Sequence, residues 1–301
     1  MELWIPITIA AAFLQNVRSA LQKHLKGVMG TQGATFVRFG FGWPIAALIV
    51  AVLYWGPGYA LPVANGSFLA WMVLGGVSQI AATFLLVHLF SFRNFAVGTA
   101  YSRTEPAQAA LFGLVFLSET VTAGTLAAIA ISVVGVMLIS VAHLRVSART
   151  LVTSVISRTA LVGLASGSMF GFSAVAYRAA SLSLGGPNFM MQAAYTLAWT
   201  TLFQTILMGG WLLATNRAEL RRIAAAWKPS LVVGVAGALA SFGWFMAMTL
   251  QQAAVVKSLA QIEMLFTFAS TVFVFKEKIN RLEVAGCLLI VGGILVLLAV
   301  R

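Results

Sequence analysis

Two glutamates inside long apolar stretches have the clearest potential for chemistry. Glu105 and Glu263 lie near the middle of the apolar segments 95–117 and 254–275 and are 158 residues apart. A carboxylate in a bilayer interior is costly unless a partner, a cavity or a pathway accounts for it. The sequence therefore predicts either a substrate or proton relay, or packing carboxylates neutralised by a neighbouring Arg or Lys.

Five basic residues also fall within apolar segments, namely Arg18, Arg38, Arg103, Arg178 and Lys257. Arg18, Arg38 and Arg103 are expected at a similar depth of roughly 8–12 Å, given a rise of 1.5 Å per helical residue. They would line one vestibule or extend toward the lipid headgroups. Lys257 is expected near the opposite face, a few residues into its segment, where extension toward the headgroups is one alternative. Arg178 holds nearly the position in its segment that Arg18 holds in the first.

Uncharged side chains in the segments complete the candidates for substrate contact: Asn16, Gln79, Tyr101, Gln192 and Trp244. Pro106 removes the hydrogen bond to the carbonyl of Ser102, so we expect a kink that opens backbone beside Tyr101 and Arg103. Trp244 is deep enough to line a pocket, with core packing as the alternative. Buried amides serve mostly for helix–helix hydrogen bonds, worth about 0.6 kcal/mol each.

Enzyme chemistry finds little support in the sequence. The chain has no Asp, three scattered His and one Cys, and it lacks the HExxH, GxSxG and P-loop motifs. We therefore predict no catalytic activity, no cofactor and no metal site.

The composition explains why these residues need membrane-spanning elements around them. The chain has 301 residues, of which 60% are hydrophobic and 9% charged, whereas soluble domains have about 45–50% and about 25%. Too few polar residues remain to coat a soluble fold, so lipid must surround most of the chain. The net charge of +12 comes from small clusters between apolar stretches, which favours a membrane surface over nucleic acid as the partner.

The apolar stretches predict an all-α integral membrane protein with ten transmembrane helices. They span residues 3–23, 31–53, 68–91, 95–117, 122–143, 159–182, 188–213, 229–250, 254–275 and 280–300.

An internal duplication organises these helices. The offset of 158 residues that relates Glu105 to Glu263 recurs in further pairs, Glu119 with Glu277 and Gly135 with Gly293. We predict a five-helix repeat at 1–143, a polar linker at 144–158 and a second repeat at 159–301. Because five is odd, the repeats are inverted about a pseudo-twofold axis in the membrane plane.

The motifs at these positions resemble a known family. Arg103-Thr104-Glu105-Pro106, Phe116-Leu117-Ser118-Glu119-Thr120-Val121 and the Gly135 helix resemble the LEP, LGE and G pattern of EamA domains in the drug/metabolite transporter superfamily. Ile262-Glu263-Met264 and Phe275-Lys276-Glu277-Lys278-Ile279 resemble a second copy, with Met264 in place of the usual Pro. The resemblance implies a transporter, often an exporter of amino acids, related metabolites or drugs, that works by alternating access.

Loop charges predict the orientation in the membrane. On the ten-helix interpretation, nearly all loop Lys and Arg lie on one side, and Arg301 alone lies on the side of the termini. Cytoplasmic loops collect Lys and Arg, so both termini are expected outside the cytoplasm. The superfamily is generally drawn with both termini inside, and the two expectations conflict.

The combined prediction is a secondary transporter, an exporter or exchanger, for small polar metabolites such as amino acids, with its site between the repeats. A carrier of organic anions or lipid-linked solutes, an intramembrane enzyme and a sensor are the alternatives. The expected partners are the lipid bilayer, a small-molecule substrate and, for coupled transport, protons. A multi-pass protein of the bacterial inner membrane is expected, as a monomer or, alternatively, a dimer.

Overall fold

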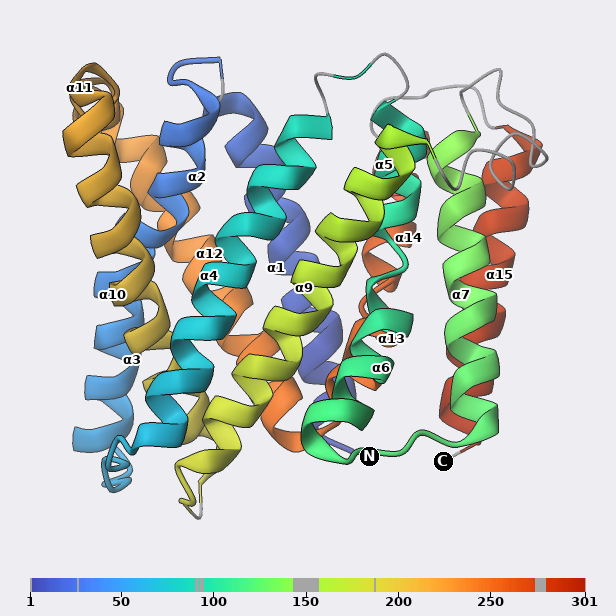
Figure 1. Cartoon of the computed structure of the whole chain (residues 1–301), viewed down its shortest axis with the longest axis horizontal. Helices are drawn as coiled ribbons and strands as arrows, with labels where there is room; N and C mark the ends of the chain where they lie inside the picture. Colours follow the sequence, from blue (N-terminus) through green and yellow to red (C-terminus); the bar gives the residue numbers. More distant parts are fainter. Residues whose placement is uncertain are drawn as a thin grey trace. The chain divides into compact units, whose positions relative to one another are not determined.

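The computed structural model describes residues 2–25, 27–89, 92, 95–142, 157–186, 188–273 and 280–300, and all regular secondary structure among them is helical (Figure 1). Seven helical stretches in these residues are long and apolar enough to cross a membrane. The helices are α1 (Trp4–Leu25), α2 (Thr31–Gly40), α3 (Gly42–Trp55), α4 (Gly66–Leu89), α5 (Phe95–Ser102), α6 (Glu105–Leu117), α7 (Ala123–Val141), α9 (Arg158–Ser183), α10 (Phe189–Thr215), α11 (Arg217–Ala225), α12 (Trp227–Leu250), α13 (Ala253–Leu259), α14 (Ile262–Phe273) and α15 (Arg281–Ala299).

Three of the predicted segments are each divided between two helices. Segment 95–117 breaks at residues 103–104, as Pro106 predicted. Segment 254–275 breaks at residues 260–261, and segment 31–53 is interrupted at Phe41, so the prediction of one continuous helix in each was wrong. Glycines flank Phe41, and Pro44 has no N–H to donate to the carbonyl of Gly40, which weakens the helix at that point.

The chain forms two compact units. The first unit contains residues 1–77 and 176–251, and the second unit contains residues 78–175 and 252–301. Each unit therefore takes segments from both halves of the sequence. The predicted polar linker 144–158 lies almost entirely outside the described residues.

In the first unit, glycines on α12 let other helices approach closely. A Cβ added at Gly243 would lie 2.9 Å from the Cβ of Ala11, and one added at Gly237 would lie 3.3 Å from the Cδ of Arg18. From Gly237 to Gly243 the residue number rises along α12, whereas from Arg18 to Ala11 it falls along α1. The helices α1 and α12 are therefore antiparallel. Leu25 and Leu212 are completely buried in the core of this unit.

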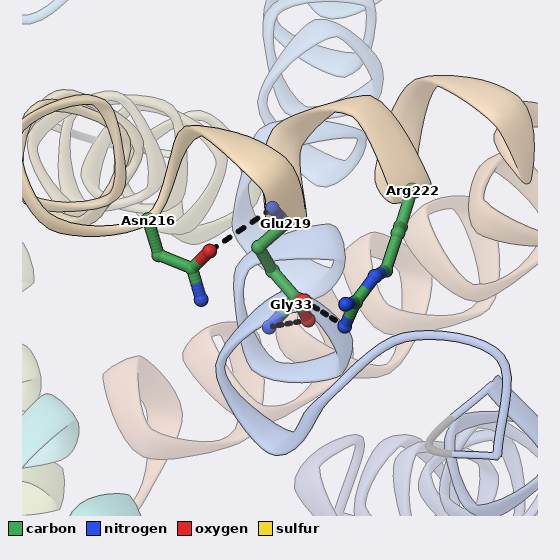
Figure 2. A network of polar contacts seen from close by, with 4 residues as sticks. All are labelled: Gly33, Asn216, Glu219 and Arg222. Atoms are coloured by element: carbon green, nitrogen blue, oxygen red, sulfur yellow. Dashed lines mark hydrogen bonds and ion pairs between the residues drawn. The ribbon is translucent and has the colours of Figure 1, made fainter.

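A buried carboxylate fixes α11 to the start of α2 (Figure 2). Asn216 caps α11 by accepting a hydrogen bond from the N–H of Glu219 at 3.2 Å. The Glu219 side chain accepts a bond from the Gly33 N–H at 3.2 Å and pairs with Arg222 at 3.1 Å. Unsatisfied N–H groups at a helix start favour an anion, so this carboxylate stabilises α2. Residues 214–228 lie between the predicted segments 188–213 and 229–250, so the helix α11 was not predicted, because its Asn216 cap was not recognised.

In the second unit, α7 and α15 pack through a contact that occurs twice. A Cβ added at Gly135 would lie 2.7 Å from the carbonyl oxygen of Gly286, and one added at Gly293 would lie 2.9 Å from that of Ala128. Both Gly135 with Gly293 and Ala128 with Gly286 are 158 residues apart. The order of the contacts shows that α7 and α15 are antiparallel, and they lie side by side in Figure 1.

Candidate functional site

The first break in the second unit exposes backbone between α5 and α6. Pro106 has no N–H, so the carbonyl of Ser102 loses its helical donor. The chain tightens into a turn in which the Arg103 N–H donates to the carbonyl of Ala100 at 3.1 Å. Thr104 closes the turn, since its hydroxyl donates to the carbonyl of Tyr101 at 2.7 Å.

The second break has the same pattern at the equivalent place in the sequence. The N–H of Gln261 donates to the carbonyl of Ser258 at 3.2 Å, and these residues lie 158 positions after Arg103 and Ala100. Met264 stands where the first break has Pro106, so proline is not required for this interruption. The break itself, and not one residue type, is the common feature of both segments.

A row of glycines on α9 follows the first broken helix. A Cβ added at Gly167 would lie 2.7 Å from the carbonyl oxygen of Ser102, and one added at Gly171 would lie 3.1 Å from that of Glu105. Gly163 packs against the backbone of Gly98. The glycine stripe on α9 therefore serves packing within the chain and supports the backbone at the break.

An ion pair joins the two broken helices. The Nζ atom of Lys257, on α13, lies 2.8 Å from the Oε1 atom of Glu105, the first residue of α6. Both side chains are about four-fifths buried, with exposures of 22% and 21%. Among the described residues, Glu105 therefore forms its ion pair with Lys257 and not with the nearby Arg103.

Unsatisfied amides surround the breaks. Gln261 is only 8% exposed, and neither its Oε1 nor its Nε2 has a hydrogen-bond partner in the part of the chain that the structure describes. Gln108 donates to the Thr104 hydroxyl at 2.6 Å, but its buried Oε1 has no donor there. A buried polar group without a partner costs about 1–3 kcal/mol. Such groups are suited to binding water or a polar solute.

The other predicted residues of the second unit are arranged as follows. Tyr101 is buried at the end of α5, and Arg103 lies partly exposed in the break. Glu263 is the second residue of α14 and is partly exposed. Gln79 lies partly exposed on α4, where its carbonyl accepts a bond from Thr83.

In the first unit, two predicted arginines lie over the same glycine. A Cβ added at Gly237 would lie 3.3 Å from the Cδ of Arg18 and 3.5 Å from the Cγ of Arg38. In the same unit, the hydroxyl of the buried Tyr177 accepts a bond from Gln204 at 3.4 Å. Sequence reasoning missed Tyr177 and Gln204, although Gln204 is an amide within a predicted span, the criterion that selected Gln192.

The remaining predicted residues of this unit serve in part to join helices. The indole N–H of Trp244 donates to the Oε1 of Gln15 at 2.9 Å, which connects α12 to α1. Gln192 is buried on α10, and Asn16 is partly exposed on α1.

Arg178 closes the end of a helix. Its guanidinium donates to the carbonyl oxygens of Met248 at 2.6 Å and Gln251 at 2.7 Å. These carbonyls belong to the C-terminus of α12, which favours a cation. Arg178 therefore caps the C-terminal end of α12.

Comparisons with known proteins give the fold and the family. Among the 27 matching chains of solved structures is one titled only as the crystal structure of a protein. It has 17% sequence identity and a TM-score of 0.73, with 99% of this chain and 97% of that chain covered. The similarity at this identity shows a shared fold. No curated protein matches the chain.

The family model for the EamA-like transporter family matches residues 157–299, which lie within the second predicted repeat. The apolar helices make the protein an integral, multi-pass membrane protein in contact with the bilayer. Residues 157–299 therefore belong to the EamA-like transporter family, and this domain indicates a membrane transporter of the drug/metabolite superfamily.

Proposed function

We propose that the protein is a secondary transporter that carries a small zwitterionic metabolite, such as an amino acid, by alternating access. The observation that supports this proposal best is the ion pair between Glu105 and Lys257 at the broken helices. An ammonium group of the substrate would bind Glu105, and its carboxylate would bind Lys257. Gln261 and Gln108 would supply further hydrogen bonds.

The charge balance of the ion pair suits alternating access. Isolated charges are costly in the membrane, whereas a closed pair is neutral as a unit. A zwitterion that opens the pair and bonds to both members leaves the site neutral again. Both the empty and the loaded carrier would therefore change conformation without moving net charge through the bilayer.

The helix breaks and the repeated contacts support a ten-helix architecture of two inverted repeats. Broken helices offer unpaired backbone groups for solutes and occur in related positions of duplicated transporters. The antiparallel pair of α7 and α15 makes the Gly135–Gly286 contact and its equivalent between Gly293 and Ala128. Such exchange of equivalent positions is what a twofold axis perpendicular to the helices produces.

The energy for transport would come from a solute gradient, from exchange or from protons. The sequence has no P-loop that would bind a nucleoside triphosphate. We place the protein in the bacterial inner membrane and expect export or exchange as its direction.

Counterflow in proteoliposomes tests the proposal. Vesicles loaded with one unlabelled amino acid at a time would take up the labelled compound through the wild-type protein. Lys257→Gln and Glu105→Gln are expected to lower the rate at least tenfold. Lys228→Gln, which alters an exposed lysine beside Trp227, is the matched control and should transport at the wild-type rate.

Stability measurements separate a substrate role from a packing role. Each single variant leaves one charge without its partner, which we expect to cost about 1–3 kcal/mol at this partly exposed position. The double variant Glu105→Gln with Lys257→Gln should recover this stability but not the transport. Transport by the double variant at the wild-type rate would contradict the proposal. Product formation without flux would instead favour an enzyme.

A further inference from the structure

We propose that the exposed face of the helix α11 binds the headgroups of anionic phospholipids. Three arginines on this face, Arg217, Arg221 and Arg222, form what we term the arginine patch. The patch belongs to the first unit alone, and the proposal does not depend on zwitterion transport.

The connections of α11 hold it at the membrane surface. The helix α10 before it and the helix α12 after it are both long and apolar enough to cross a membrane. A single residue separates α11 from each of them, Asn216 at its start and Ala226 at its end. A nine-residue helix linked so closely to two spanning helices lies at the depth of the lipid headgroups.

Exposed residues on either side of α11 agree with this depth. The Trp227 ring is exposed at the start of α12, and tryptophan is enriched at membrane–water interfaces. Leu213, near the end of α10, and Val232, in the second turn of α12, are exposed apolar side chains suited to contact with acyl chains. The arginine patch therefore lies where headgroups cover the acyl chains.

The two faces of α11 differ in charge. Glu219, its one acidic residue, and Ile223 are buried against the protein, one turn apart. Arg217 and Arg221 are also one turn apart, so they share the outer face, and both are exposed. The acid therefore points inward and offsets Arg222, with which it pairs (Figure 2). The charges of Arg217 and Arg221 are not offset by any acid within α11.

The positions of the guanidinium groups suit a phosphate. Arg217 donates from Nε to the carbonyl of Leu213 at 3.0 Å, which holds the side chain beside the last turn of α10 while its Nη groups can bind a headgroup. The side chain of Arg222 is 58% exposed although it pairs with Glu219, and a guanidinium has five N–H donors. Arginine binds phosphate through paired N–H donors.

Anionic lipids fit the patch better than zwitterionic lipids. In phosphatidylcholine the choline group offsets the phosphate, whereas phosphatidylglycerol keeps a net negative charge. Each basic residue near an anionic membrane surface strengthens binding about fivefold. The lipids beside the arginine patch should therefore be richer in phosphatidylglycerol than the rest of the bilayer.

Quenching by brominated lipids in nanodiscs measures this enrichment. The full chain carries a fluorophore at Ala225→Cys, an exposed position one turn after Arg221, in a background with Cys287→Ser. The nanodiscs contain phosphatidylcholine and phosphatidylglycerol in one fixed ratio, and only one of the two lipids is brominated at a time. The quenching ratio, divided by the bulk ratio, gives the local enrichment. We expect an enrichment of about twofold or more that decreases at high salt, because salt screens exposed charges.

Variants with matched charge separate the patch from the net charge of the protein. Arg217→Gln with Arg221→Gln removes two charges, leaves the pair of Arg222 and Glu219 intact, and should bring the lipid ratio close to the bulk value. Arg158→Gln with Arg281→Gln removes two exposed arginines of the second unit and should keep the enrichment.

Lysine variants and a stability measurement show whether the change is local. Arg217→Lys with Arg221→Lys keeps both charges and should retain most of the enrichment. In nanodiscs of phosphatidylcholine alone, wild type and the double Gln variant at these positions should unfold at the same temperature, because both arginines are exposed. A bulk lipid ratio in the labelled wild type, or full enrichment in the double Gln variant, would overturn the proposal. An equal loss of enrichment in the Arg158 and Arg281 control would overturn it as well.

Discussion

Individual residues show what a sequence reveals about charges in a membrane and what it leaves to the fold. The apolar surroundings of Glu105 and Lys257 predicted that both needed an explanation. Their pairing at 2.8 Å could not be predicted, because the two residues lie far apart in the chain and only the packing of α6 against α13 brings them together. The hydrogen bond from Arg178 to a carbonyl at the end of α12 could not be predicted either, because it also joins residues far apart in the chain.

The first prediction compares the two repeat-related glutamates. Glu105→Gln is expected to slow substrate counterflow more than Glu263→Gln, because Glu105 lies at the Pro106 break and pairs with Lys257. If transport is coupled to protons, Glu263→Gln should weaken proton-driven uptake while exchange persists. Counterflow and proton-driven uptake in liposomes measure the two effects. Wild-type rates for both variants would reduce the glutamates to packing residues.

At the scale of the helices, local signals predicted one break and missed the two at Phe41 and at residues 260–261. Pro106 predicted the interruption between α5 and α6 because a proline cannot donate the helical hydrogen bond. The interruption between α13 and α14 has no such residue and depends on its tertiary surroundings. The helix α11 was missed for a different reason, since its Asn216 cap was present in the sequence but lay in a short charged loop.

The second prediction concerns the support of the first break. Gly167→Ala places a Cβ 2.7 Å from the carbonyl oxygen of Ser102, so α9 must move away from the break. We expect a loss of about 1–3 kcal/mol of stability, as for other overpacked sites, together with slower counterflow. Gly292→Ala on α15 is the control, because a Cβ there has no neighbour within 4 Å. Equal unfolding midpoints and transport rates for the two variants would show that the close packing on α9 does not matter.

At the scale of the whole molecule, composition predicted the fold class, and the motifs that resemble EamA domains predicted the family. The hydrophobic content required a helical membrane protein, and the described helices and the match at residues 157–299 agree with this. The two compact units could not be predicted from the duplication, because each unit draws on both halves of the sequence. Contacts between distant segments define such units, and periodicity along the chain does not record them.

The third prediction is the orientation in the membrane. The distribution of Lys and Arg places residues 144–158 in the cytoplasm and the C-terminus outside. Arg149→Cys, in a background with Cys287→Ser, should resist an impermeant thiol reagent in intact cells, whereas a cysteine at the C-terminus should react. External labelling at position 149 with none at the C-terminus would reverse the orientation.

The repeated contact between α7 and α15 bears on how such a chain could have arisen. Gly135 contacts Gly286, and the equivalent residues, Gly293 and Ala128, contact each other in the same way. Two identical subunits make such paired contacts across a twofold axis. A single ancestral half, present in both orientations, would make this seam with a copy of itself. Gene fusion then requires no new interface and frees each half to change separately. Lys257 stands 158 residues after Thr99, so the charge that pairs with Glu105 belongs to one half alone.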